Sequence, residues 1–148
     1  MDLDDLYQEI ILEHYKQPKN QGIVAEADIE VDGRNPFCGD EIKLTLKIDE
    51  GTVSDVKFKG SGCAISQASA SVMTEHIKGK KVSEVRELFQ EFSHMVRGEE
   101  HQHQHIDDMD ELSAFQGVSS YPTRVKCAML AWNAMKDGIE RELDKHGE

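Results

Sequence analysis

The sequence predicts a single α+β domain in which helices pack on one face of a small antiparallel sheet of about three strands. Three observations predict it. A helical pattern opens the chain, two alternating segments follow within residues 41–59, and the apolar period then returns to that of helices. The chain has 148 residues and no internal repeat or linker-like stretch, so we expect one domain spanning residues 1–148.

Residues 3–15 predict an amphipathic helix that ends before Pro18, since a proline disfavours helical backbone in the residue before it. Its face is defined by three- and four-residue spacings of Leu3, Leu6, Tyr7, Ile10 and His14. Residues 28–32 carry two β-branched apolar residues in alternation and predict an edge strand.

Residues 41–49 alternate apolar and polar side chains, which predicts a strand with one buried and one wet face. Asp49-Glu50-Gly51 supplies a turn, and residues 56–59 continue the alternation. The two segments therefore predict a β-hairpin.

The helical period resumes with the small residues of 64–78, and Gly79 is expected to close that helix. Ser83 is a candidate N-cap for a second helix, whose apolar stripe runs from Val85 to Val96. Met73, Met95, Met129 and Met135 have the spacing of residues that fill a core.

Residues 99–108 read as an exposed connection, and a short helix is expected around Leu112 and Phe115. Pro122 suits the first position of a final helix. The apolar stripe of that helix consists of Cys127, Leu130, Ala131, Ala134, Met135, Ile139 and Leu143.

The charge balance excludes several classes of function. Lys and Arg number 17 against 29 Asp and Glu, giving a formal net charge of -12. An acidic field repels nucleic-acid phosphates and anionic lipids, so neither is an expected partner. No apolar stretch approaches the ~18 residues of a membrane span, and the acidic N-terminus does not resemble a secretory signal. We expect a cytoplasmic protein.

The three cysteines are the most informative residues. An odd number cannot pair fully within the chain, and cytosolic thiols commonly serve metal binding, catalysis or packing. Cys38 lies in a turn-rich segment with Asp40 two residues later. Cys63 stands where a helix is expected to begin, and that position favours a thiolate. Cys127 lies early in the final helix.

Segments of these kinds commonly converge at one end of an α+β sheet. Three thiols and one carboxylate match the four positions of tetrahedral zinc. The same thiols could hold an iron–sulfur cluster. No Cys-x-x-Cys pair is present, so spacing alone does not decide between the two.

At these motifs the sequence resembles the SufU/IscU family of iron–sulfur cluster assembly proteins, which are related to NifU. The resemblance covers nearly the whole chain in order. The matching segments are Asn-Pro-Phe-Cys-Gly-Asp at 35–40, Gly-Ser-Gly-Cys-Ala-Ile-Ser at 60–66, Arg-Val-Lys-Cys-Ala-Met-Leu-Ala-Trp at 124–132 and the helix segment at 7–15. It implies the family fold, a small antiparallel sheet with helices on one side.

Three features resemble the SufU branch more than the IscU branch. IscU-type scaffolds carry a His ligand immediately before the third cysteine, where this chain has Lys126. The segment 98–117 resembles the SufU insertion. The Leu-Pro-Pro-Val-Lys chaperone motif of IscU proteins is replaced by Ser-Tyr-Pro-Thr-Arg at 120–124.

The resemblance implies a zinc-dependent sulfurtransferase. It makes Cys38, Asp40, Cys63 and Cys127 zinc ligands, and it makes Cys38 the thiol that accepts persulfide sulfur from a SufS-type cysteine desulfurase. In such proteins a desulfurase side chain can replace the departing cysteine on the zinc. A SufB-type scaffold complex is the implied next acceptor. We add the hypothesis that Asp40 repositions as Cys38 moves.

Two alternatives stay open. The chain could be an IscU-type scaffold that assembles and transfers a [2Fe–2S] cluster on the same ligands, although Lys at neutral pH is a poor metal ligand. It could also hold zinc for stability alone, in which case metal removal should unfold it. Exposed rim residues expected around the site are Phe37, Ile65, Arg124 and Lys126, whereas His101, His103 and His105 are interpreted as a solvated loop.

Overall fold

The computed structural model describes residues 3–36, 39–99 and 111–145. In chain order its elements are α1 (Leu3–Lys16), β1 (Ile29–Asn35), β2 (Asp40–Asp49), β3 (Thr52–Ser61), α2 (Ala64–Ile77), α3 (Val82–Val96), the 3-10 helix η1 (Glu111–Ser120) and α4 (Pro122–Lys145). The predicted order of a helix, then strands, then helices is confirmed.

The three strands form one antiparallel sheet in the order β1-β2-β3. Glu50 and Gly51 form the tight turn between β2 and β3 with φ angles of 51° and 78°. Two consecutive positive φ angles give the turn the twist that a two-residue hairpin requires. The predicted hairpin is confirmed, and β3 is longer than the predicted 56–59 because its pairing with β2 runs from Thr52 to Ser61.

One face of the sheet packs against the hydrophobic core, and the other face is less exposed to solvent than the alternation predicts. Leu44 and Leu46 are fully buried, as their alternation predicts. Thr45 was expected on the wet face but is also fully buried. The segment between α1 and β1 crosses that face, and the Val24 N–H donates a hydrogen bond to Thr45 Oγ1 at 2.9 Å. Alternation alone could not show this cover, because it comes from a segment with no regular structure.

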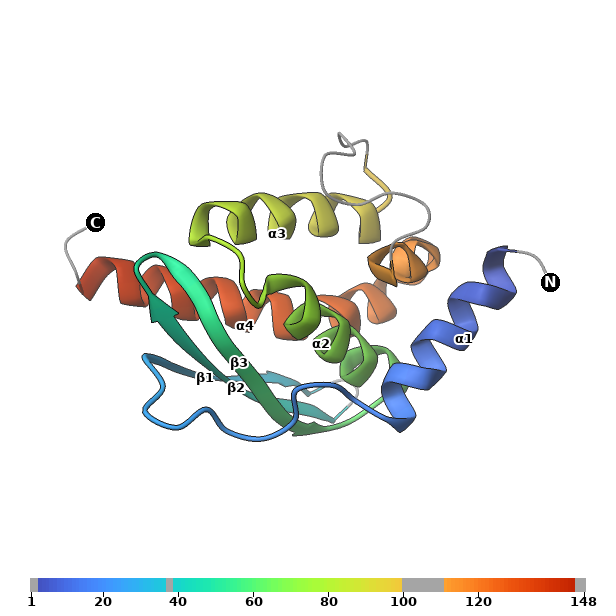
Figure 1. Ribbon diagram of the computed structural model, residues 1–148. Coiled ribbons are helices and arrows are strands. Elements are labelled where there is room, and N and C mark those ends of the chain that lie inside the picture. Colours follow the sequence, from blue (N-terminus) through green and yellow to red (C-terminus); the bar gives the residue numbers. More distant parts are fainter. Residues whose placement is uncertain (1–2, 37–38, 100–110, 146–148) are drawn as a thin grey trace.

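The helices lie on the face of the sheet that is opposite the segment between α1 and β1 (Figure 1). Helix α4 packs on β1 and β2, α2 packs on β3, and these two helices pack on each other. α1 and η1 contact each other and both contact α2. The helices of the described residues include none that is long and apolar enough to span a bilayer.

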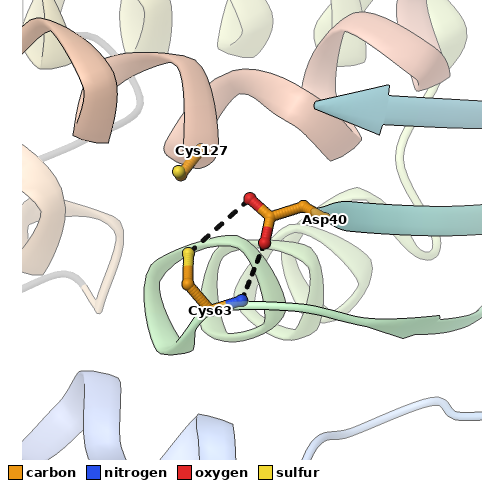
Figure 2. Close-up of side chains that lie close together, drawn as sticks. All are labelled: Asp40, Cys63 and Cys127. Carbon is orange, nitrogen blue, oxygen red and sulfur yellow. Dashed lines mark hydrogen bonds between the residues drawn. The ribbon is translucent and has the colours of Figure 1, made fainter. Parts of the chain in front are cut away.

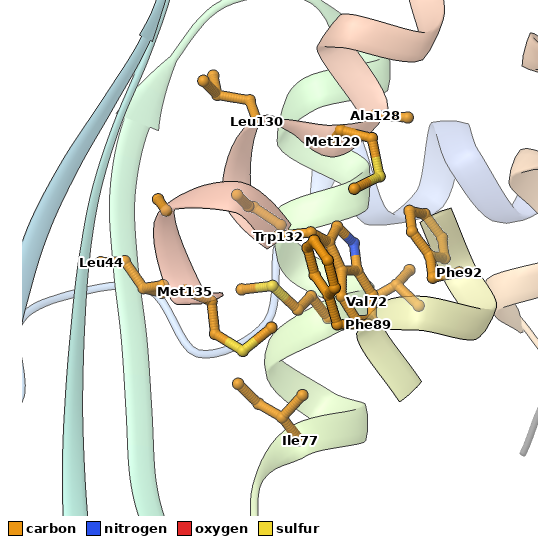
Figure 3. Packing of buried hydrophobic residues seen from close by; sticks show 14 of the residues in the cluster. Leu44, Val72, Ile77, Phe89, Phe92, Ala128, Met129, Leu130, Trp132 and Met135 are labelled. Atoms are coloured by element: carbon orange, nitrogen blue, oxygen red, sulfur yellow. The ribbon is translucent and has the colours of Figure 1, made fainter. Parts of the chain in front are cut away.

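Trp132 of α4 lies at the centre of the core (Figure 3). Its ring stacks on that of Phe92 with centroids 4.3 Å apart and an interplanar angle of 13°. The indole N–H donates a hydrogen bond to Ser69 Oγ at 3.1 Å, so the buried donor is satisfied. The four methionines predicted to fill the core are all buried.

Helices α3 and η1 also differ from the sequence prediction. α3 begins at Val82 with Lys81 as its N-cap residue, rather than at a Ser83 cap. The Glu84 carboxylate accepts the Lys81 N–H at 3.4 Å and supplies the capping interaction from within the helix. The expected short helix near Phe115 is a ten-residue 3-10 helix. Most of the expected insertion at 98–117 lies outside the described residues.

Candidate metal centre

Three of the four predicted ligands meet at one end of the sheet (Figure 2). Asp40 opens β2, Cys63 immediately precedes α2, and Cys127 lies in the second turn of α4. One ligand atom from each lies within 4.8 Å of the other two. The predicted convergence of a turn, a strand-to-helix junction and a helix start therefore holds for these three residues. Cys38 and Phe37 lie outside the described residues.

Cys63 is the N-cap residue of α2, with φ -72° and ψ 164°. Its Sγ accepts the backbone N–H of Ser66 at 3.4 Å, as a serine or aspartate oxygen does at an ordinary N-cap. The sulfur is thus placed at the positive end of a 14-residue helix, where a negative charge is stabilised. The change from strand to helical period located this position correctly.

Asp40 is almost completely buried, with 1% of its surface exposed. Its Oδ1 accepts the Cys63 N–H at 2.7 Å, and its Oδ2 lies 3.7 Å from Cys63 Sγ. Among the described residues, no Lys or Arg forms an ion pair with this carboxylate. A buried carboxylate without a cationic partner is costly, so the environment of Asp40 suits a bound cation.

Gly62 leaves the space that Asp40 occupies. Its φ is +147°, and a Cβ at this position would lie 2.1 Å from Asp40 Oδ1 and 2.8 Å from its Cγ. Only glycine combines that backbone conformation with the absent side chain. The chain between β3 and α2 can therefore pass directly over the carboxylate.

The donor set fits zinc. Thiolate and carboxylate groups are among its usual protein ligands. With Zn–S near 2.3 Å and Zn–O near 2.1 Å, tetrahedral geometry separates a sulfur from an oxygen by about 3.6 Å. The 3.7 Å between Cys63 Sγ and Asp40 Oδ2 matches that separation. The residues present would accept such an ion without a large rearrangement.

The surroundings of the site are partly open. Arg124 and Lys126 are exposed, and Ile65 is half-buried. The Arg124 guanidinium lies over the Tyr121 ring, 4.4 Å from its centroid. A groove beside the site runs between α1, η1 and the start of α4; its lining includes Tyr7, Ile65, Val118, Tyr121 and Arg124.

A second group of ligand-type side chains joins α1, α2 and η1. His14 Nε2 lies 2.6 Å from Glu111 Oε2 and 3.7 Å from Glu75 Oε1. Its Nδ1 lies 2.7 Å from Ser71 Oγ. Hydrogen bonds thus account for both ring nitrogens, and we assign this group a role in holding the helices together.

The comparisons with known proteins define the class of protein. The sequence profile of the NifU-like N terminal domain matches residues 6–128. The chain therefore belongs to this family, which includes the IscU and SufU proteins.

Within this family, the chain is similar over most of its length to individual SufU and IscU proteins. It is 46% identical over 140 residues to the zinc-dependent sulfurtransferase SufU of Bacillus subtilis, covering 95% of this chain and 93% of that protein. It is 41% identical over 142 residues to the iron-sulfur cluster assembly scaffold protein IscU of Streptococcus pyogenes, covering 96% and 87%.

Solved structures share the fold. A NifU-like protein (N-terminal) from Brucella abortus superposes with a TM-score of 0.83 at 26% identity, covering 96% of each chain. A candidate iron-sulfur cluster assembly scaffold protein of the SUF system from Fervidobacterium islandicum gives a TM-score of 0.81 at 37% identity, covering 88% of this chain and 93% of that one. The predicted family and fold class are confirmed.

Proposed function

We propose that this protein is a SufU-type zinc-dependent sulfurtransferase of iron–sulfur cluster assembly in the cytoplasm. It accepts persulfide sulfur from a SufS-type cysteine desulfurase and passes it to a SufB-type scaffold complex. The observation that carries this proposal is the 46% identity, over 95% of the chain, to a zinc-dependent sulfurtransferase. The cluster of Asp40, Cys63 and Cys127 supplies the matching chemistry.

In this proposal Asp40, Cys63 and Cys127 hold the zinc, and Cys38 is the fourth ligand. Cys38 stands two residues before Asp40 in the sequence, and this spacing supports its assignment as the fourth ligand. Bound zinc would keep the thiols deprotonated and reduce the charge that the thiolates and the carboxylate bring together.

Cys38 is the proposed sulfur acceptor. Its thiolate attacks the outer sulfur of a persulfide on the desulfurase, and a new S–S bond forms at Cys38. The S–S bond of the donor breaks, and the donor cysteine leaves as a thiolate. The outer sulfur moves with its charge or proton, so the exchange needs no external oxidant or reductant.

Asp40 has a catalytic role in the proposal besides ligation. Its hydrogen bond to the Cys63 N–H holds the carboxylate at the site, where it can reposition as Cys38 moves. Persulfide transfer should fall in Asp40→Ala even in the fraction that retains zinc. Transfer at the wild-type rate by fully zinc-loaded Asp40→Ala would contradict this role.

The groove beside the site is the proposed docking surface for the desulfurase. Its half-buried Ile65 follows Cys63 by two residues, and its exposed Arg124 precedes Cys127 by three. A partner seated there would reach the site without crossing the core. The cation of Arg124 would suit an acidic side chain of that partner.

A scaffold that assembles a [2Fe–2S] cluster is the second candidate. The 41% identity to an IscU scaffold protein favours it, and thiolates with a carboxylate could ligate iron. Lys126 stands against it, because its exposed ammonium has no lone pair to offer a metal.

Elemental analysis of anaerobically purified protein separates the two candidates, with Cys38→Ala purified in parallel. The sulfurtransferase predicts about one zinc per chain, no iron, and a Cys38→Ala protein that stays folded. Iron with acid-labile sulfide would favour the scaffold. Absence of metal would contradict both.

A further inference from the structure

The Asn35 side chain contacts Cys127 directly. Its Nδ2–H donates a hydrogen bond to Cys127 Sγ, with 3.6 Å between the nitrogen and the sulfur. Asn35 is 5% exposed and Cys127 is 2% exposed, so solvent does not compete for either group. The two residues are 92 positions apart in the sequence. The contact therefore exists only in the folded protein.

The strand pairing fixes the position of this amide. Asn35 is the last residue of β1 and lies directly opposite Asp40, the first residue of β2. At this end of the β1–β2 pair, the Asp40 carboxylate therefore lies near Cys63 and the Asn35 amide lies near Cys127. α4 packs against β1, which brings Cys127 to the amide.

The two described sulfurs have the same kind of support. Cys63 Sγ accepts a backbone N–H from Ser66, and Cys127 Sγ accepts the side-chain N–H of Asn35. An N–H donor to a thiolate is charge-assisted, and burial strengthens it. The donor to Cys63 is a backbone N–H of helix α2, which a change of side chain other than to proline leaves in place. The donor to Cys127 is a side chain, so a single substitution removes it.

We propose that Asn35 is a positioning residue of the metal centre. It fixes the orientation of the Cys127 side chain and withdraws electron density from its sulfur. Cys127 thereby stays in place when the ligand set is rearranged. The proposal rests on the proposed function, because it requires Cys127 to be a metal ligand. Groups behind the direct ligands commonly tune metal sites in this way.

Two substitutions remove the amide donor. Asn35→Leu keeps the number and branching of the side-chain heavy atoms, and Asn35→Ala shortens the side chain, so an effect common to both reports on the lost amide rather than on shape. Thr45→Val is the matched control. It removes a buried hydrogen-bonding group in the same sheet, five residues along β2 from Asp40.

Two measurements are made on folded protein: zinc affinity by competition with a chromophoric chelator at fixed pH, and the sulfur-to-metal charge-transfer band of the Co²⁺-substituted protein. Both Asn35 variants should bind zinc about 10–100-fold more weakly, the usual effect of such losses. Their band should move to longer wavelength, because a sulfur without its donor gives up electron density more readily. Thr45→Val should match the wild type in both.

Wild-type zinc affinity in the Asn35 variants, or an unmoved charge-transfer band, would overturn the proposal. The band separates electronic tuning from a general loss of stability, which Thr45→Val also produces. A wild-type protein that bound neither zinc nor Co²⁺ would instead contradict the proposed function. The two failures are therefore distinguishable.

Discussion

The Asp40 carboxylate accepts the backbone N–H of Cys63 at 2.7 Å and so joins the first residue of β2 to the N-cap of α2. This bond crosses 23 residues of sequence and is made by a side chain with 1% of its surface exposed. The same carboxylate aims its second oxygen at Cys63 Sγ. Asp40 is therefore both a structural link and a candidate ligand.

Asp40→Asn should separate these two roles. The amide oxygen can still accept the Cys63 N–H, so the fold should persist. The variant should lose at least about 10-fold in zinc affinity, because a neutral amide is a far poorer zinc ligand than a carboxylate. Chelator competition and far-UV circular dichroism measure the two effects. Asp32→Asn, which changes an exposed aspartate of β1, is the control and should bind zinc as the wild type does.

Gly62→Ala should disturb the site by steric overlap. The new Cβ would meet the Asp40 carboxylate at 2.1 Å, so either the carboxylate or the β3–α2 connection must move. We expect weaker zinc binding and a loss of stability of at least about 1 kcal/mol.

Gly51→Ala is the control for Gly62→Ala. Gly51 also has a positive φ, but no atom lies within 4 Å of its Cβ position. Thermal unfolding should show backbone strain in both variants, and only Gly62→Ala should lose zinc affinity. Equal zinc affinity in the two would show that the overlap with Asp40 is relieved elsewhere.

His14→Leu should lower stability without affecting the metal centre. It removes the hydrogen bonds to Ser71 and Glu111 from a side chain that is 4% exposed. The expected loss is about 1–3 kcal/mol in the free energy of unfolding. Ser71 lies eight residues along α2 from Cys63, about 12 Å of helical rise, so zinc affinity should not change.

Glu75→Gln provides the comparison for His14→Leu in urea unfolding. Its carboxylate is more than one-third exposed and lies 3.7 Å from the His14 ring, so the loss should stay below about 1 kcal/mol. A loss of zinc binding in His14→Leu would contradict the purely structural role of this group.

The sequence located Cys63 well because its signals are local. Glycines flank it, and the period changes from strand to helix at its position. The convergence of Asp40 and Cys127 with Cys63 followed from the family resemblance and the fold class, and the geometry agrees with it. The ligand roles themselves, and the persulfide role of Cys38, stay predictions that the experiments above test.

Other features depend on tertiary contacts, which a local sequence pattern cannot predict. Asn35 was part of a recognised motif, but its donation to Cys127 depends on the β1–β2 register and on the docking of α4. Thr45 was predicted to be exposed, but it is buried because a segment without regular structure covers it. Such cover can be seen only once the chain is folded.

The proposed function depends above all on the transfer of sulfur to Cys38. The zinc-loaded protein would be incubated with a SufS-type cysteine desulfurase and L-cysteine and then alkylated. The masses of its cysteine-containing peptides would be measured by mass spectrometry. We expect one added sulfur atom on the Cys38 peptide and none in Cys38→Ala. Loss of the modification after zinc removal, with the fold intact, should accompany it. An unmodified Cys38, or equal sulfur loading of Cys38→Ala, would contradict the proposed function.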